Sequence, residues 1–161
     1  MQIDTIRFGQ VNIDEKKLIL FREGILGLEG LKTFALLQFE ESYPIIWLQS
    51  VDDGDVCLPV LDTFAVMPDY VFNIDDEDVK QLGLKGPEDL HVISVLVIPD
   101  NIEQMTVNLA APIIINTITG KAKQIMLGGS DYNVRTPIFP GICKMIREEG
   151  SADAGSVEKA E

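Results

Sequence analysis

The chain alternates short apolar runs with turn-forming residues over most of its length. Short runs rich in valine, isoleucine, leucine and phenylalanine, bounded by glycine, proline, asparagine or aspartate, are typical of β-strands. We predict strands within 3–8, 11–13, 17–21, 34–39, 45–50, 56–61, 69–74, 91–98, 105–110, 112–117 and 123–127. Many short strands with little helix between them predict a mainly β fold, a sandwich or a barrel.

One segment in the middle of the chain carries the signals of a short helix. Asp75 or Asp76 is placed to cap its N-terminus, and the acidic residues that follow lie in the first turn, where the helix dipole favours negative charge. Gly83 is placed to end this helix. A second short helix is predicted near the C-terminus, because FPGICKMIREE (139–149) has apolar residues at helical spacing.

The run HVISVLVI (91–98) is the strongest candidate for a core strand. Its nearly continuous apolar character predicts a strand that is buried on both faces and that ends before Pro99. At 161 residues the chain is long enough for one domain with its own core. We therefore expect a folded domain over 1–149 and a disordered acidic tail over 150–161, where small and charged residues leave almost nothing to bury.

The segment TVNLAAPIIINTIT (106–119) combines the most hydrophobic run of the chain with polar and turn-forming residues. Pro112 cannot donate a hydrogen bond to a sheet, so it should mark an edge, a bulge or a break. One hypothesis is that this break shapes a binding edge where Asn108 and Asn116 bond a partner. The alternative is that Pro112 only turns the chain between two strands and that both amides satisfy local backbone groups.

The charge balance restricts the possible partners. The chain has 26 acidic and 13 basic residues, with a formal net charge of −13. Binding to RNA, DNA or an anionic membrane requires a basic surface, so none of the three is an expected partner. The acidity either promotes solubility alone or attracts a basic protein. The acidic residues cluster at three places: Asp52, Asp53 and Asp55; Asp75, Asp76, Glu77 and Asp78; and the region 148–161.

No pattern typical of a catalytic or metal site occurs in the sequence. The single histidine, His91, begins an apolar strand, and Cys57 lies between apolar neighbours, so both are interpreted as structural residues. DDGD (52–55) lacks the ligand spacing of a calcium loop, and Asp-Gly at 53–54 instead predicts a two-residue hairpin turn. We expect no cofactor. Without a signal sequence or a bilayer-length apolar stretch, a cytoplasmic location is expected.

Several blocks of the sequence, in this order, resemble the bacterial flagellar assembly factor FliW. They are FREGILGLEGLKTFALLQF (21–39), IIWLQSVDD (45–53), DYVFNIDDEDVKQLGL (69–84), VISVLVIP (92–99) and VNLAAPIIINTITGKAKQIML (107–127). NLAAPIIIN is the most specific of them. The resemblance extends from about residue 1 to about residue 140, and it implies a predominantly β, single-domain fold of antiparallel or mixed strands resembling a barrel.

The resemblance also implies a function. Proteins of the FliW family bind flagellin, and they bind and antagonise CsrA, a small RNA-binding translational repressor, which couples flagellin secretion to flagellin translation. The chain is then expected to be a non-enzymatic binding protein whose partners are flagellin and CsrA, with a monomer favoured. A basic RNA-binding partner would account for the acidity, and the clusters at 52–55 and 75–78 are the candidate contacts.

Two other functions stay open at the level of the sequence. A small acidic hydrolase would require two carboxylates that face each other across a substrate with separated pKa values. A barrel that binds an apolar small molecule would require an open mouth and interior space.

Overall fold

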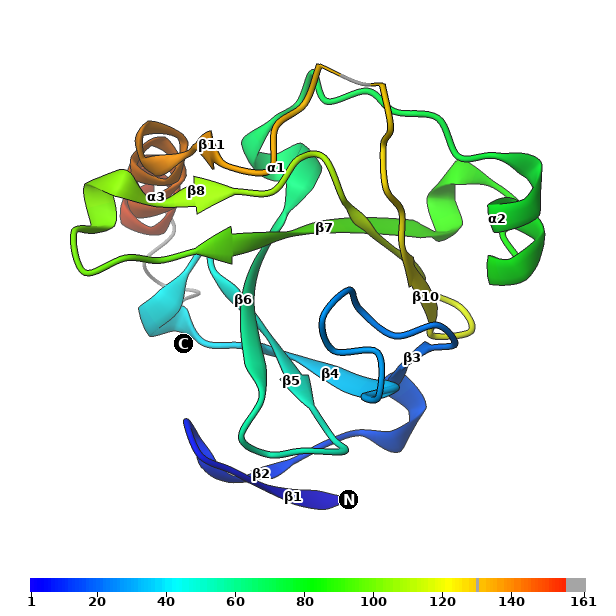
Figure 1. The fold of residues 1–161 in the computed structure, drawn as a ribbon. Coiled ribbons are helices and arrows are strands. Elements are labelled where there is room, and N and C mark those ends of the chain that lie inside the picture. The colour runs from blue at the N-terminus through cyan, green and yellow to red at the C-terminus, as the bar shows by residue number, and fades with distance from the viewer. Residues whose placement is uncertain (130, 156–161) are drawn as a thin grey trace.

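The fold consists mainly of β-strands (Figure 1). The computed structural model describes residues 1–129 and 131–155, with side chains described up to residue 149. The strands are β1 (Gln2–Thr5), β2 (Gly9–Asn12), β3 (Ile19–Phe21), β4 (Thr33–Gln38), β5 (Ile46–Ser50), β6 (Cys57–Asp62), β7 (Leu90–Val97), β8 (Thr106–Val107), β9 (Ile113–Asn116), β10 (Lys121–Gln124) and β11 (Thr136–Pro137). The helices are α1 (Thr63–Val66), α2 (Asp76–Leu82) and α3 (Phe139–Gly155), with 3-10 turns η1 (Glu15–Lys17), η2 (Glu40–Ser42), η3 (Pro87–Asp89) and η4 (Ile102–Gln104).

The main sheet closes into a barrel, as the sequence predicts. Its strands follow the order β7, β6, β5, β4, β3, β10, β9, and β9 pairs back with β7. All of these pairs are antiparallel except β3 with β10, which is parallel. Strands β8 and β11 extend the sheet beyond one end of β7, and β1 with β2 forms a separate hairpin.

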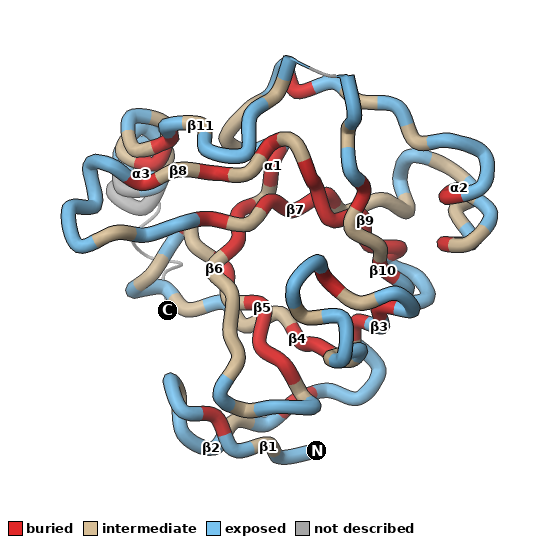
Figure 2. The backbone as a smooth tube through the Cα atoms, viewed as in Figure 1, coloured by how far each residue is buried: buried red, intermediate tan, exposed pale blue. Residues whose placement is uncertain are grey.

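Apolar side chains fill the barrel. Phe21, Phe34, Leu48, Val60 and Ile93 come from five different strands, are at most 1% exposed and belong to one packed cluster. The rings of Phe21 and Phe34 meet edge to face, with centroids 5.3 Å apart. The space that the ribbon leaves open in Figure 1 is therefore occupied by the core, and Figure 2 shows the buried backbone positions that surround it. A ligand inside the barrel would have to displace these side chains.

Strand β7 is covered on both faces from Val92 to Leu96, which confirms the prediction for that part of 91–98. The prediction is wrong at the end of the run, because Val97 and Ile98 are 56% and 37% exposed and β7 ends at Val97. Ile93 points into the barrel, whereas Val92 packs outside it with Leu82 of α2. Leu96 belongs to a third cluster, beneath α1 and α3. Ser94, which is fully buried, exchanges a hydrogen bond of 2.7 Å with Thr63 of α1. A strand with neighbours on both faces needs apolar residues at consecutive positions.

The helix predicted around 75–83 is present as α2. The side chain of Asp75 caps it by accepting a hydrogen bond of 2.9 Å from the backbone N–H of Asp78. Gly83 ends it in the left-handed conformation, with φ of 67°, which a residue without a Cβ adopts at little cost.

The predicted C-terminal helix is present as α3, which begins at Phe139 and whose backbone continues to Gly155. The predicted acidic tail over 150–161 therefore begins within α3. Its residues 156–161 lie outside the described residues, so its disorder stays a prediction. No helix in the described chain combines the length and the apolar character needed to span a lipid bilayer.

The strand predicted over 69–74 is absent. Tyr70 is 3% exposed, Phe72 is partly buried and Val71 is 71% exposed, so the alternation of apolar and exposed positions is real. The segment nevertheless pairs with no strand, because Tyr70 and Phe72 anchor it to a cluster of aromatic rings. The Tyr70 hydroxyl donates a hydrogen bond of 2.6 Å to the carbonyl oxygen of Leu109. Alternation thus predicted the burial correctly and the pairing wrongly.

Candidate functional site

The first predicted acidic cluster lies in the loop between β5 and β6. Asp52, Asp53 and Asp55 are exposed. The Asp52 carboxylate accepts hydrogen bonds of 2.8 and 3.0 Å from the backbone N–H groups of Lys32 and Thr33, and this ties the loop to the start of β4. Asp53 accepts a bond of 3.0 Å from the N–H of Asp55. Two of the three carboxylates therefore shape the loop, and Asp55 faces solvent.

The predicted hairpin is present, because β5 and β6 pair as antiparallel neighbours, but the predicted two-residue length of its turn is wrong. The connection spans the six residues 51–56. Gly54 lies against the β1–β2 hairpin, where a Cβ at its position would come within 2.0 Å of the carbonyl oxygen of Asp4. The Gly54 carbonyl accepts a hydrogen bond of 3.1 Å from the N–H of Ile6. Contact with the hairpin, which lies far away in sequence, sets the shape of the loop.

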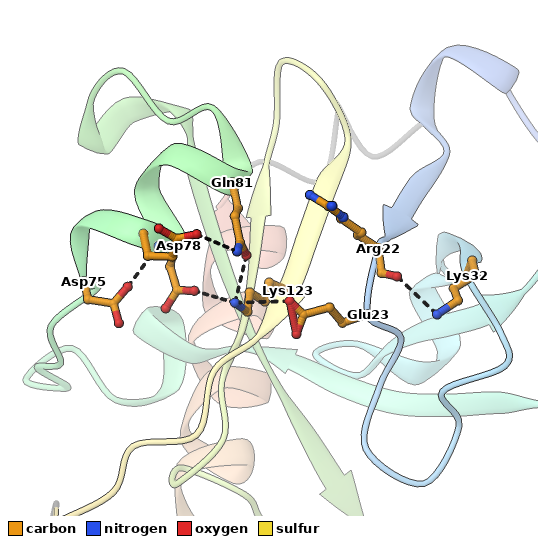
Figure 3. A network of polar contacts seen from close by, with 8 residues as sticks. Arg22, Glu23, Lys32, Asp75, Asp78, Gln81 and Lys123 are labelled. Carbon is orange, nitrogen blue, oxygen red and sulfur yellow. Dashed lines mark hydrogen bonds and ion pairs between the residues drawn. The ribbon is translucent and has the colours of Figure 1, made fainter.

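The second cluster, on α2, is tied to the barrel by a lysine. Asp76 and Glu77 are exposed, whereas the side chain of Asp78 is only 11% exposed. Its carboxylate lies 2.6 Å from the ammonium of Lys123, on β10 (Figure 3). The same ammonium lies 2.9 Å from Oε1 of Gln81 and 3.4 Å from the Glu23 carboxylate.

This network fixes the charge of Lys123. The hydrogen bond to Asp78, assisted by the charges of Asp78 and Glu23, raises the pKa of Lys123 despite partial burial. Asp78 therefore has a structural partner, which the sequence pattern did not reveal.

The predicted acidic clusters are not brought together. Figure 1 shows the β5–β6 loop beside the β1–β2 hairpin and α2 on another side of the barrel. The third cluster begins on α3, and its residues from 150 onward have no described side chains. The clusters at 52–55 and 75–78 therefore form separate negative patches, not one negative face.

A groove lies beside the N-terminus of α2. It has a volume of about 750 Å³ and runs between the segment before α2 and the chain that follows β10. We call it the acidic groove. Its lining includes four carboxylates, from Glu23, Asp75, Glu77 and Asp78, and the ammonium of Lys123, which pairs with Glu23 and Asp78. Apolar side chains of Val71, Phe72, Met126 and Leu127 complete it. Val71 and Met126 are 71% and 53% exposed, so negative charge and apolar surface occur together there.

One wall of the acidic groove is an extended backbone with a free edge. The N–H groups of Ile125 and Leu127 donate bonds of 2.9 Å to the carbonyl oxygens of Pro112 and Ala110. Met126 lies between them, and its backbone makes no backbone hydrogen bond within the described chain. Because successive residues of an extended chain face opposite ways, Met126 faces away from that pairing.

Asn116 is a structural residue in this fold. It is 1% exposed. Its amide nitrogen donates bonds of 2.8 and 3.3 Å to the carbonyl oxygens of Leu82 and Gly83, at the end of α2. Its side-chain oxygen accepts bonds from the N–H groups of Ile118 and Thr119. Asn116 thus joins α2 to the turn after β9 and offers no group to a partner in this conformation.

The binding edge proposed near Pro112 is not present. Pro112 is buried just before β9, and β9 pairs with β7 on one side and β10 on the other. Asn108 is partly exposed and accepts a bond of 3.0 Å from the N–H of Ala110. The geometry agrees with the alternative interpretation, in which Pro112 turns the chain and the amides satisfy local backbone groups.

His91 and Cys57 both have structural surroundings. The His91 imidazole lies 3.7 Å from the Asp62 carboxylate, and this contact lowers the pKa of Asp62. Burial raises the pKa of the Cys57 thiol, which opposes formation of a thiolate. Within the described part of the chain, no three His, Cys, Asp or Glu side chains gather as a metal site.

Sequence reasoning missed Lys123 and the exposed apolar residues of the groove. The alternation in KAKQ (121–124) places Lys121 and Lys123 on the outer face of a strand, which is a usable signal. It does not tell which acid they meet, because Lys123 and Asp78 are 45 residues apart. Only the packing of α2 on the barrel brings the two together.

The sequence and the fold both match one protein family. The sequence profile of the FliW protein family matches residues 2–138. A flagellar assembly factor FliW from Caldicellulosiruptor saccharolyticus is 38% identical over 141 residues, which are 88% of this chain and 92% of the relative. Another from Thermotoga neapolitana is 42% identical over 132 residues, 81% of this chain and 89% of the relative.

A solved structure gives the same result. The crystal structure of a flagellar assembly factor FliW superposes with a TM-score of 0.81 at 34% sequence identity, and the match covers 87% of this chain and 98% of that one. The matched region contains the whole barrel and both walls of the acidic groove. The chain belongs to the FliW family of flagellar assembly factors.

Proposed function

We propose that this chain is a non-enzymatic, cytoplasmic regulator that binds flagellin and antagonises CsrA. Family membership supports a role in flagellar assembly. The observation that carries the choice of a polypeptide ligand is the acidic groove, which combines four carboxylates with exposed apolar side chains. Such a surface suits a protein with basic and apolar residues.

CsrA is the partner assigned to the acidic groove. An RNA-binding protein carries a positive surface, and the exposed carboxylates of Asp75 and Glu77 attract it during encounter. Val71 and Met126 then offer apolar contacts that exclude water. The backbone of Met126 offers a donor and an acceptor to an extended segment of the partner. A CsrA molecule held there is surrounded by negative charge, which disfavours bound RNA.

Flagellin is assigned to a different surface. Val97, Ile98 and Ile102, at the end of β7 and in η4, are 56%, 37% and 51% exposed. Helix α3 packs beside η4 and adds Ile146, which is 49% exposed. We call these four residues the apolar patch. The resemblance to the FliW family implies a flagellin partner whose terminal segments are apolar and helical. An amphipathic helix binds through such a patch.

The two surfaces rest on a shared part of the core. Phe72 and Leu127, which line the acidic groove, pack against the cluster that contains Met105 and Ile142. Ile142 lies on α3, one turn before Ile146 of the apolar patch. A shift of α3 on binding flagellin therefore has a packed route to the groove walls, which would couple the two ligands.

Titration of the purified protein with flagellin and with CsrA tests this function. The wild type is expected to bind both. Ile102→Asp, which puts a charge into the apolar patch, is expected to lower flagellin affinity by about tenfold or more and to leave CsrA binding unchanged. Ile118→Asp is the matched control, because Ile118 is 75% exposed in the turn between β9 and β10.

Three results would contradict the proposal. The wild type could retain neither protein, Ile102→Asp could leave flagellin affinity intact, or Ile118→Asp could reduce it equally. Circular dichroism of each variant confirms that the fold is unchanged.

A further inference from the structure

A second cavity, of opposite charge, lies on the other side of Lys123. It has a volume of about 400 Å³ and lies between α2 and the outer face of β3 and β10. We call it the cationic cleft. Four of the chain's 13 basic residues line it, namely Arg22, Lys32, Lys121 and Lys123. The lining contains one carboxylate, Glu23, although the whole chain has twice as many acidic as basic residues.

The parallel pairing of β3 with β10 creates this concentration of positive charge. Leu20 lies opposite Lys121, and Phe21 lies opposite Ala122. Phe21 and Ala122 point into the barrel, so the residues on either side of them point outward. Leu20 and Lys121 therefore share the outer face with the residues that follow, Arg22 and Lys123.

The cations in the cleft differ in how well they are paired. Lys123 is held by Asp78 and Glu23. Lys32 donates a hydrogen bond of 3.1 Å to the carbonyl oxygen of Arg22 (Figure 3). The guanidinium of Arg22 and the ammonium of Lys121 have no acidic partner among the described residues. Cations that line one cleft repel one another, and an anion bound among them would relieve that repulsion.

The rest of the lining is apolar. Leu20 is 47% exposed at the outer face, and Leu82 contributes from α2. A ligand that fits must therefore bring an apolar body as well as a negative charge. The volume is within the range of about 300–1,000 Å³ that small-ligand sites occupy, at its lower end.

We propose that the cationic cleft binds an amphipathic carboxylate. The carboxylate meets Arg22 and Lys121, and an aliphatic body of roughly leucine size lies on Leu20. Two sources have this chemistry: a free short-chain organic acid, and the terminal carboxylate of a polypeptide that ends in an apolar residue. Glu23 and Lys123 line both this cleft and the acidic groove, so the two cavities share a wall.

Backbone amide NMR of the full chain tests the site with 4-methylpentanoate and with an acetylated tetrapeptide, Ala-Ala-Ala-Leu, that has a free C-terminus. Each carboxylate is paired with its uncharged amide. We expect saturable shifts at residues 20–22 and 121–123 with the carboxylates alone. We expect Arg22→Gln and Lys121→Gln each to lower the affinity by about three- to tenfold. Lys144→Gln makes the same charge change at an exposed position of α3 and should leave the affinity unchanged.

The two carboxylate probes also distinguish the sources. Tighter binding of the acid indicates a small-molecule ligand, and tighter binding of the peptide indicates a chain terminus. Three results would overturn the proposal. The carboxylate and its amide could cause equal chemical-shift changes, Lys144→Gln could lower the affinity as much as the cleft variants do, or no saturable shift could occur up to roughly 10 mM ligand.

Discussion

At the scale of single residues, the buried amide of Asn116 has the largest structural role of the polar residues predicted for the site. It makes four hydrogen bonds to backbone groups, two at the end of α2 and two in the turn after β9. Removing the side chain leaves the Leu82 carbonyl, whose bond is buried, and three partly buried backbone groups without this partner, which costs more than the loss of an exposed bond. Among the described residues, the side chain of Asn108 makes one hydrogen bond, which it accepts from the N–H of Ala110, and Asn108 is partly exposed.

This contrast predicts different stabilities for the two alanine variants. Asn116→Ala should lower the free energy of unfolding by about 2–4 kcal/mol, and Asn108→Ala by about 0.5–1.5 kcal/mol. Denaturant unfolding of both variants measures the difference. A loss of partner binding by Asn116→Ala at unchanged stability would contradict the structural role described here.

Tyr70 offers a test of a single buried bond. Its hydroxyl donates to the Leu109 carbonyl at 2.6 Å, and burial raises the pKa of the phenol, so the donor stays protonated. Tyr70→Phe should lower the free energy of unfolding by about 1–2 kcal/mol, because the Leu109 carbonyl loses its partner while the ring packing is kept. Unfolding in urea measures this. An unchanged stability would show that the bond contributes nothing net.

Local residue roles were predictable from the sequence, and distant ones were not. An N-cap at Asp75 or Asp76 and an end of α2 at Gly83 follow from rules that operate within one turn, and the structure selects Asp75. The partners of Asn116 lie up to 34 positions away, so no local rule reveals them. Asn116 therefore had two open interpretations until the packing of α2 was known.

At the scale of elements, the position of α2 decides the shape of both cavities. Leu82 packs α2 on Val92 and Ile114, and Asp78 binds Lys123 of β10. The acidic groove and the cationic cleft lie on the two sides of this attachment. Changes that loosen α2 should therefore affect both cavities together.

The end of α2 can be tested at Gly83. Its φ of 67° is unfavourable for any residue with a Cβ, although a Cβ there would meet only Nδ2 of Asn116, at an ordinary contact distance of 3.9 Å. Gly83→Ala should lower the free energy of unfolding by about 1–2 kcal/mol. Gly128→Ala is the matched control, because Gly128 is exposed, has no left-handed φ and has no atom within contact distance. Equal effects of the two substitutions would rule out the strain argument.

The ion pair of α2 predicts a pH dependence. The pKa of Lys123 is raised in the folded chain, so its stabilising effect is complete below the unfolded value of about 10.4 and is lost as pH rises through the folded value. The stability difference between wild type and Lys123→Met should therefore shrink above about pH 10.4. Denaturant unfolding across that range measures it. A difference that is constant with pH would contradict the ion pair.

Strand positions were mostly predictable from alternation, since each barrel strand needs one face toward the core. The errors have physical causes. The segment 69–74 is extended but is held by aromatic side chains instead of by a strand partner. The short α1 and β11 have too few residues to show a period. The wide β5–β6 loop depends on the hairpin that it contacts.

At the scale of the whole molecule, closure of the barrel removes the strand edges near Pro112 and moves recognition to the outer surface. The acids gather in separate patches, and one of them, at 75–78, borders a groove with exposed apolar side chains. The cluster at 52–55 lies on a loop where two carboxylates are bonded to the backbone. Both clusters thus contain bonded carboxylates, and the apolar side chains beside the α2 cluster make it the stronger candidate for a basic protein partner.

The central claim is that the acidic groove binds CsrA. The most direct test measures the affinity for CsrA as a function of salt concentration for the wild type, Glu77→Lys and Asp55→Lys. Glu77 lines the acidic groove, and Asp55 is also exposed but lies outside it. We predict that wild-type affinity falls as salt rises, and that Glu77→Lys lowers the low-salt affinity by about tenfold with a weaker salt dependence. Asp55→Lys should match the wild type. Equal behaviour of Glu77→Lys and the wild type would contradict the account.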